Sequence, residues 1–302
     1  MPGKRSYVFC PSEKKLLRGL NCRSIFGFFF LFFIFGAGTA YCLSIKVPEE
    51  VFNGEPIPVA IRYDEPVEKC LLKYNGRSLE FPFVSGDENV VWLGAGLGMQ
   101  GALKIEMEFT GPEGKQTAVR EVMIKKKEYP KQHLKLPENM VSFDQKTLNR
   151  IYKEKGVIRS ALSLITPSRY WTDDFIFPVR GKVLSEFGLR RFMNGKPRSA
   201  HRGVDFRAAQ GKPIIACNNG RVVLTGKYFF GGNTVVVDHG LGILSLYMHL
   251  DKIMVEQGDE IEKGRPVGLA GSTGRATGPH LHFAICIWGE MVNPLGVLKK
   301  QG

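Results

Sequence analysis

Several patterns that would identify common classes of protein are missing from this sequence. The six cysteines form no Cys-x-x-Cys pair, which argues against a zinc site built from thiolates. The glycine-rich stretch 271–278 lacks a Gly-Lys-Ser or Gly-Lys-Thr ending and no helical pattern follows it, so we reject a nucleotide-binding loop there. Lysine- and arginine-rich helices and interleaved basic and aromatic runs are also absent, and we therefore expect no nucleic-acid partner.

The composition is that of a folded, basic chain. Of its 302 residues, 43% are hydrophobic and 24% are charged, which argues against a disordered protein and allows two domains and a further segment. The net charge is +13, and residues 1–24 hold six basic residues against one acidic residue. A basic surface attracts polyanions such as an anionic envelope polymer or membrane, although the remaining charge is spread out, as on an ordinary solvated surface.

The N-terminal segment, residues 1–43, has the order of an export signal. Its basic stretch is followed by an apolar run, 25–35, and then by small residues, 36–40. The uncharged stretch from Ser24 to Ile45 is also long enough to span a bilayer, so a cleaved signal and a retained membrane anchor both remain open. In either case the rest of the chain is exported, because positive charge stays on the cytoplasmic side. We expect a periplasmic or cell-envelope protein, held at the inner membrane if the segment is retained.

Three further regions follow, and together they predict an all-β protein. Residues 44–127 alternate polar and apolar side chains between turn signals, which favours an immunoglobulin-like β-sandwich. Residues 128–174 are predicted to be a linker, mostly helical, with a helix that begins after the cap residue Asp144. Residues 175–298 are rich in glycine and in strand patterns, and predict a compact antiparallel β-sheet domain.

Five of the six histidines lie in this last domain, and two short segments have the spacing of a metal site. His201 and Asp205 are four residues apart, with Gly203 between them to let the backbone bend, and both side chains are good zinc ligands. His280 and His282 are two residues apart in a predicted strand, so their side chains share a face while Leu281 enters the core. Two neighbouring imidazoles are costly to hold together unless a metal or a proton transfer uses them.

The other histidines and cysteines are expected to be less directly involved. His249 ends a strand, and alternation places it with Ser245 and Tyr247, away from the apolar face. We interpret His239 as a structural residue in a turn between two strands. Cys217 and Cys286 lie in apolar stretches and are expected to be buried, with a disulfide between them left open.

These segments together resemble the lysostaphin-type (LytM-like) zinc endopeptidases. The resemblance covers about residues 175–298 and rests on the blocks Phe187–Arg190, His201–Phe206, Tyr247–Leu250 and Gly278–Phe283, in the order of the family. It implies one zinc ion per chain, held by His201, Asp205 and His282, with His249 and His280 as an unliganded catalytic pair. Three protein ligands leave a fourth position for water, whose pKa zinc lowers to about 7. Which histidine of the pair is the general base stays open.

The resemblance also implies a function. A protein that resembles this family is expected to be a cell-wall hydrolase that cleaves peptide bonds in peptidoglycan stems or cross-links. The alternative is a non-enzymatic relative that binds and activates another wall hydrolase. The sandwich domain lies outside the resemblance and could be a spacer, bind a protein regulator or cover the groove. A likeness of residues 255–264 to half of a lipoyl-carrier barrel lacks a suitable lysine at a hairpin tip, so we read it as shared architecture only.

Overall fold

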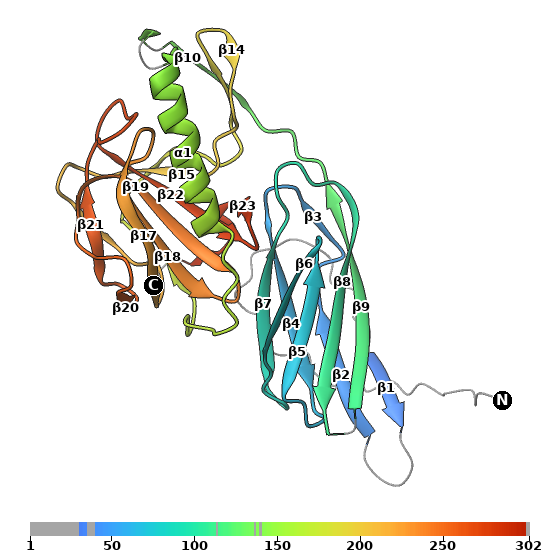
Figure 1. Ribbon diagram of the computed structural model, residues 1–302. Coiled ribbons are helices and arrows are strands. Elements are labelled where there is room, and N and C mark those ends of the chain that lie inside the picture. Colours follow the sequence, from blue (N-terminus) through green and yellow to red (C-terminus); the bar gives the residue numbers. More distant parts are fainter. Residues whose placement is uncertain (1–29, 35–39, 113, 136, 139–140, 300–302) are drawn as a thin grey trace. The chain divides into compact units, whose positions relative to one another are not determined.

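The computed structural model describes the chain except for residues 1–29, 35–39, 113, 136, 139–140 and 300–302 (Figure 1). The described residues are mostly in strands, in agreement with the all-β prediction. They divide into two compact units. The first contains residues up to 51 with 57–93 and 100–125, and the second contains 52–56, 94–99 and everything from residue 126 on.

The predicted export segment lies largely outside the described residues. Within it the structure describes strand β1 (Phe30–Ile34) and the first residues of strand β2 (Ala40–Lys46), which pair antiparallel. In the part of the chain that is described, no helix is both long and apolar enough to cross a membrane.

Two sheets form the first unit. One has the strand order β1-β2-β4-β7 and the other β3-β9-β8-β5-β6. Alternating residues of β4, β5 and β8 are fully buried, and the ring of Tyr63 on β4 lies 5.3 Å from that of Phe109 on β8, so the sheets share one core. The remaining strands are β3 (Glu50–Phe52), β4 (Pro56–Tyr63), β5 (Lys69–Tyr74), β6 (Arg77–Pro82), β7 (Glu88–Gly94), β8 (Gly101–Gly111) and β9 (Gly114–Lys125).

A ten-stranded sheet dominates the second unit. Its main order is β12-β15-β22-β19-β18-β17-β20, with β16, β21 and β23 attached, and all its pairs are antiparallel, as predicted. Its strands are β12 (Val183–Ser185), β15 (Val204–Arg207), β16 (Pro213–Ile215), β17 (Gly220–Tyr228), β18 (Gly232–Gly240), β19 (Ile243–Ile253), β20 (Glu260–Ile261), β21 (Pro266–Ala270), β22 (His280–Ile287) and β23 (Glu290–Val292).

Two small sheets accompany the large one. Strand β10 (Lys131–Leu134) pairs parallel with β13 (Arg190–Met193), which also pairs with β14 (Lys196–Pro197). Strand β11 (Phe175–Ile176) pairs parallel with β24 (Leu298–Lys299), and a short 3-10 helix, η2 (Pro294–Gly296), precedes β24.

Helix α1 (Gln145–Leu162) covers one face of the large sheet (Figure 1). It begins after Asp144 as predicted, because the carboxylate of Asp144 accepts a hydrogen bond of 2.7 Å from the backbone N–H of Thr147. The apolar end of the helix packs on residues of β17, β18, β19 and β22, including Leu246 and Ala284. Cys286 belongs to the same cluster, and neither it nor buried Cys217 is in a disulfide, so the disulfide that the sequence left open is not formed.

Candidate metal centre

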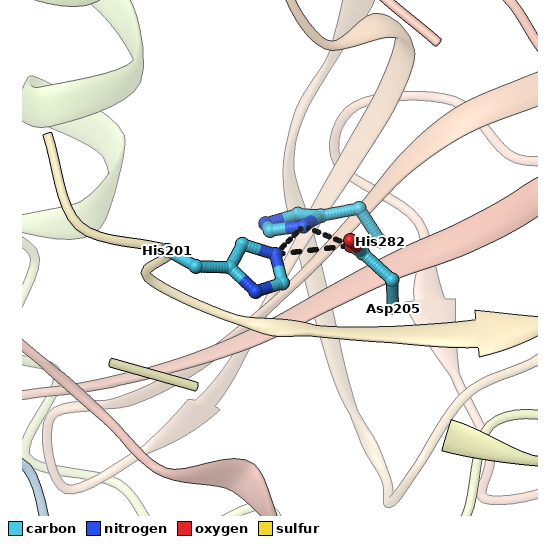
Figure 2. Close-up of side chains that lie close together, drawn as sticks. All are labelled: His201, Asp205 and His282. Carbon is cyan, nitrogen blue, oxygen red and sulfur yellow. Dashed lines mark hydrogen bonds and ion pairs between the residues drawn. The ribbon is translucent and has the colours of Figure 1, made fainter. Parts of the chain in front are cut away.

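The large sheet places Asp205 and His282 side by side. Asp205 on β15 lies directly opposite His282 on β22 in the antiparallel ladder, so both side chains project from the same face. His201 lies in the segment before β15 and its ring reaches the same point (Figure 2). The side chain of His201 is 1% exposed and those of Asp205 and His282 are 13% and 14% exposed, so the cluster lies just below the surface.

Three atoms converge at the centre of this cluster. Nε2 of His201 lies 3.0 Å from Oδ1 of Asp205 and 3.0 Å from Nδ1 of His282, and that Nδ1 lies 2.8 Å from the same Oδ1 (Figure 2). Ligands about 2.1 Å from a tetrahedral zinc ion stand roughly 3.4 Å apart, so this triangle is slightly tighter than a filled site. Two imidazole nitrogens and one carboxylate oxygen are a donor set that zinc accepts.

A backbone carbonyl fixes which nitrogen of His201 faces the centre. Nδ1 of His201 lies 2.7 Å from the carbonyl oxygen of Glu186, which can only accept, so Nδ1 carries the proton. In the neutral ring Nε2 then carries a lone pair, which is directed at the carboxylate of Asp205. Both groups are hydrogen-bond acceptors. A 3.0 Å contact between two acceptors requires a positive charge, supplied either by an extra proton or by a metal ion. Such a second hydrogen bond is typical of metal-bound histidine.

Opposing effects act on the acidity of this cluster. Burial would raise the pKa of Asp205, but hydrogen bonds and electrostatic interactions with His201 and His282 outweigh it and leave that pKa well below its usual range. Burial lowers the pKa of His282, against the opposite pull of Asp205. The carboxylate is thus ionised and His282 tends toward neutrality, which are the protonation states that metal binding requires.

Gly203 lies at a bend in the chain, and its lack of a side chain makes room for the His282 ring. A Cβ atom at this position would lie 2.6 Å from the carbonyl oxygen of Phe283 and 2.7 Å from Cε1 and Nε2 of His282. Gly203 lies at a bend, as expected, although without a positive φ, and the steric restriction comes in addition. The absence of a side chain lets β15 approach the His282 ring.

His280 and His249 lie beside the cluster. His280 shares the face of His282 on β22 as predicted, and its Nε2 lies 4.0 Å from Oδ1 of Asp205. The rings of His249 and His280 are 4.7 Å apart, and those of His249 and His282 are 6.1 Å apart. Burial lowers the pKa of His249 to about 4.

Backbone carbonyls orient this pair as well. Nδ1 of His280 donates to the carbonyl of Gly278 at 2.8 Å, and Nδ1 of His249 donates to the carbonyl of Thr273, also at 2.8 Å. Each neutral ring therefore carries its lone pair on Nε2. The loop 271–278 thus orients both histidines. The sequence could not predict these contacts, because every residue has a backbone carbonyl and nothing marks the two that accept from His249 and His280.

The predicted orientation of His249 is wrong. Simple alternation would place it with Ser245 and Tyr247, on the face opposite His282, yet its ring lies beside His280. The cause is local: His249 has a φ of +63°, in the left-handed region, which turns its side chain to the face of Met248 and His282. Its backbone N–H donates to the carbonyl of Gly231 at 2.7 Å and holds this conformation. Such strain is often concentrated at functional sites.

His239 is structural, as expected, but it is not in a turn. It lies in strand β18 and is fully buried. Its Nδ1 donates to the carbonyl of Asn219 at 2.7 Å, and its Nε2 accepts from the hydroxyl of Ser245 at 2.8 Å, which also contacts Tyr247. Burial lowers the pKa of His239 to about 4 and raises that of the neighbouring Cys217 thiol to about 11, so neither is charged at neutral pH.

These residues lie in a segment that matches a known protein family. Residues 199–294 match peptidase family M23. The chain is 39% identical over 122 residues to the peptidoglycan DD-endopeptidase ShyA of Vibrio cholerae, covering 39% of this chain and 28% of ShyA. It is 38% identical over 119 residues to the DD-carboxypeptidase/endopeptidase Mpg of Neisseria meningitidis, covering 39% of this chain and 27% of Mpg. It therefore spans little more than a quarter of the length of these relatives.

The similarity to a solved structure can extend over most of the chain. A Pseudomonas aeruginosa protein, solved under the description peptidase M23, has a TM-score of 0.61 and 29% sequence identity. The similarity covers 80% of this chain and 92% of that protein. The likeness in structure therefore extends well beyond the residues that match the family in sequence.

Proposed function

We propose, from the premise that the C-terminal domain of this chain belongs to peptidase family M23, that the protein is a zinc-dependent endopeptidase that cleaves peptide bonds in peptidoglycan stems or cross-links. The observation that carries the proposal is the convergence of Nε2 of His201, Oδ1 of Asp205 and Nδ1 of His282, with Nδ1 of His201 bonded to a backbone carbonyl. The substrate class follows ShyA, the relative named as a peptidoglycan DD-endopeptidase.

The donor set fits one zinc ion. His201, Asp205 and His282 would hold it, since their ligand atoms come together among the residues that the structure describes. When bound, zinc supplies Lewis acidity and makes water a nucleophile at neutral pH. Three protein ligands rather than four are typical of a catalytic site.

The remaining chemistry belongs to His249 and His280. Their protonated Nδ1 atoms are engaged by carbonyls, so each ring offers Nε2 as the atom that can accept a proton from the attacking water and return it to the leaving amine. His249 is neutral at pH 7 because burial lowers its pKa to about 4, so its Nε2 is available to accept a hydrogen bond. As an imidazolium, either ring can stabilise negative charge that develops on the carbonyl oxygen.

The other assignments follow from this function. We assign residues 1–43 to an export signal or inner-membrane anchor, 44–127 to an immunoglobulin-like sandwich, 128–174 to a linker with a helix, and 175–298 to the peptidase domain. A peptidoglycan substrate supports a periplasmic or envelope location. The sandwich would serve as a spacer or as the site of a protein regulator.

Digestion of purified peptidoglycan tests the proposal. The zinc-loaded chain should release peptide fragments whose masses differ from the uncut material by one water per cleaved bond. A chelator should stop release and added zinc should restore it, while a His282→Ala variant should remain inactive with added zinc. Absence of release by zinc-loaded protein would refute the enzyme and would favour the alternative, an activator or binding module for another hydrolase.

A further inference from the structure

Strand β10 contacts an arginine of strand β13, and this arginine contacts the metal cluster in turn. Strand β10 lies before helix α1 in the chain and pairs parallel with β13, with Gln132 next to Arg191 in the register. Nε of Arg191 donates a 3.1 Å hydrogen bond to the side-chain oxygen of Gln132. The far end of the same guanidinium points at the metal cluster.

Arg191 contacts two groups there with a single nitrogen. Its Nη2 lies 3.3 Å from Oδ2 of Asp205 and 3.3 Å from the hydroxyl oxygen of Ser185. That hydroxyl lies 3.3 Å from Nδ1 of His201, the ring that contacts Oδ1 of Asp205. The guanidinium side chain is only 22% exposed, so its contact with the 13% exposed Asp205 is largely shielded from water.

The two oxygens of Asp205 therefore have separate partners. Oδ1 faces His201 and His282, whereas Oδ2 faces Arg191. A carboxylate can rotate about its Cβ–Cγ bond and exchange its two oxygens unless one of them is held. A guanidinium suits this task because its donors are fixed in one plane, so Nε can be anchored while Nη2 is aimed.

We propose that Arg191 is a positioning residue that holds Asp205 with Oδ1 toward the metal, and that Gln132 of strand β10 aims Arg191. The inference rests on the proposed function, because it takes Asp205 as a zinc ligand. It makes the strand before α1 a part of the metal centre, although its sequence contains no metal-binding pattern. Partners that orient a ligand in this way usually change metal affinity about 10–100-fold when removed.

Zinc affinity, measured by competition with a coloured chelator, tests the proposal without any peptidase assay. Arg191→Gln should bind zinc about 10–100-fold more weakly than the parent protein. The matched control is Arg190→Gln, which removes the neighbouring arginine of β13, whose ion pair is with the exposed Glu128. The control should bind zinc as the parent does. A purely structural salt bridge would lower the melting temperature of Arg191→Gln but leave the zinc affinity of the folded protein unchanged.

Two more variants keep the test decisive if Arg191→Gln fails to fold. Arg191→Lys keeps the charge but not the planar fork, and should also weaken zinc binding. Gln132→Ala should weaken it less, and should add nothing further when combined with whichever Arg191 variant folds, because both changes act through the same contact. Parent-like affinity in the Arg191 variants, or independent effects of the two positions, would overturn the proposal. A parent protein that binds no zinc would instead refute the proposed function.

Discussion

Replacing Gly203 by alanine is a small change that the structure predicts to be severe. The added Cβ would lie 2.7 Å from two atoms of the His282 ring and 2.6 Å from the carbonyl oxygen of Phe283. Contacts of a Cβ atom below 3.0 Å essentially never occur in proteins. An ordinary contact begins at 3.4 Å, so the ring must move by 3.4 − 2.7 = 0.7 Å or more, or β15 must shift. Nδ1 of His282 lies 2.8 Å from Oδ1 of Asp205, so such a displacement would separate one proposed metal ligand from the other two.

The cost should appear in both function and stability. A misplacement of about 1 Å in a reacting site can lower the rate about 100-fold. An extra methyl group in a packed site costs about 1–3 kcal/mol of folding free energy. We therefore expect Gly203→Ala to bind zinc more weakly, to lose about 100-fold in peptidoglycan cleavage, and to melt at a lower temperature.

Gly278→Ala is the matched control, because it adds the same methyl group to the loop that carries His280. A Cβ at Gly278 meets nothing within 4 Å, and the carbonyl that accepts from His280 is retained. Zinc affinity and cleavage by Gly278→Ala should stay within a few-fold of the parent protein. If Gly203→Ala binds zinc and cleaves as the parent does, the steric account of the His201–Asp205 segment is wrong.

Three further outcomes are expected. The pKa of His239 is lowered from 6.5 to about 4 by burial, so below pH 6.5 the unfolded chain takes up a proton that the folded chain excludes. Between pH 6.5 and 4 this site should lower the free energy of unfolding by up to about 3 kcal/mol. In His239→Gln the free energy of unfolding should therefore change less steeply with pH, by the equivalent of about one bound proton. Gly156→Ala, in the middle of α1 with open space around it, should raise the unfolding free energy in urea by about 0.5–1 kcal/mol. His249→Asn, which tolerates the φ of +63°, should keep its zinc by metal analysis but lose about 10²–10⁴-fold in cleavage rate.

The sequence predicted those parts of the site that depend on strand period. His280 and His282 share a face because alternate residues of a strand do so, and Leu281 is fully buried between them as expected. The cap at Asp144 was equally predictable, since the interaction with Thr147 is local.

The parts that escaped prediction depend on long-range geometry. That Asp205 lies opposite His282 is a matter of register between strands that are far apart in the chain. The left-handed φ of His249 places its side chain on the face opposite to the one that alternation predicts, and nothing in the local sequence indicates this conformation. The contact of Arg191 with Asp205 is likewise visible only after folding.

We propose different roles for two neighbouring histidines: His282 holds the metal, and His280 acts in catalysis without binding it. This proposal is tested most directly by measuring zinc content and peptidoglycan cleavage together in His282→Ala and His280→Ala. We predict that His282→Ala loses both zinc and activity, and that His280→Ala retains about one zinc ion per chain but loses activity. Loss of zinc from both variants, or full activity in His280→Ala, would contradict the account.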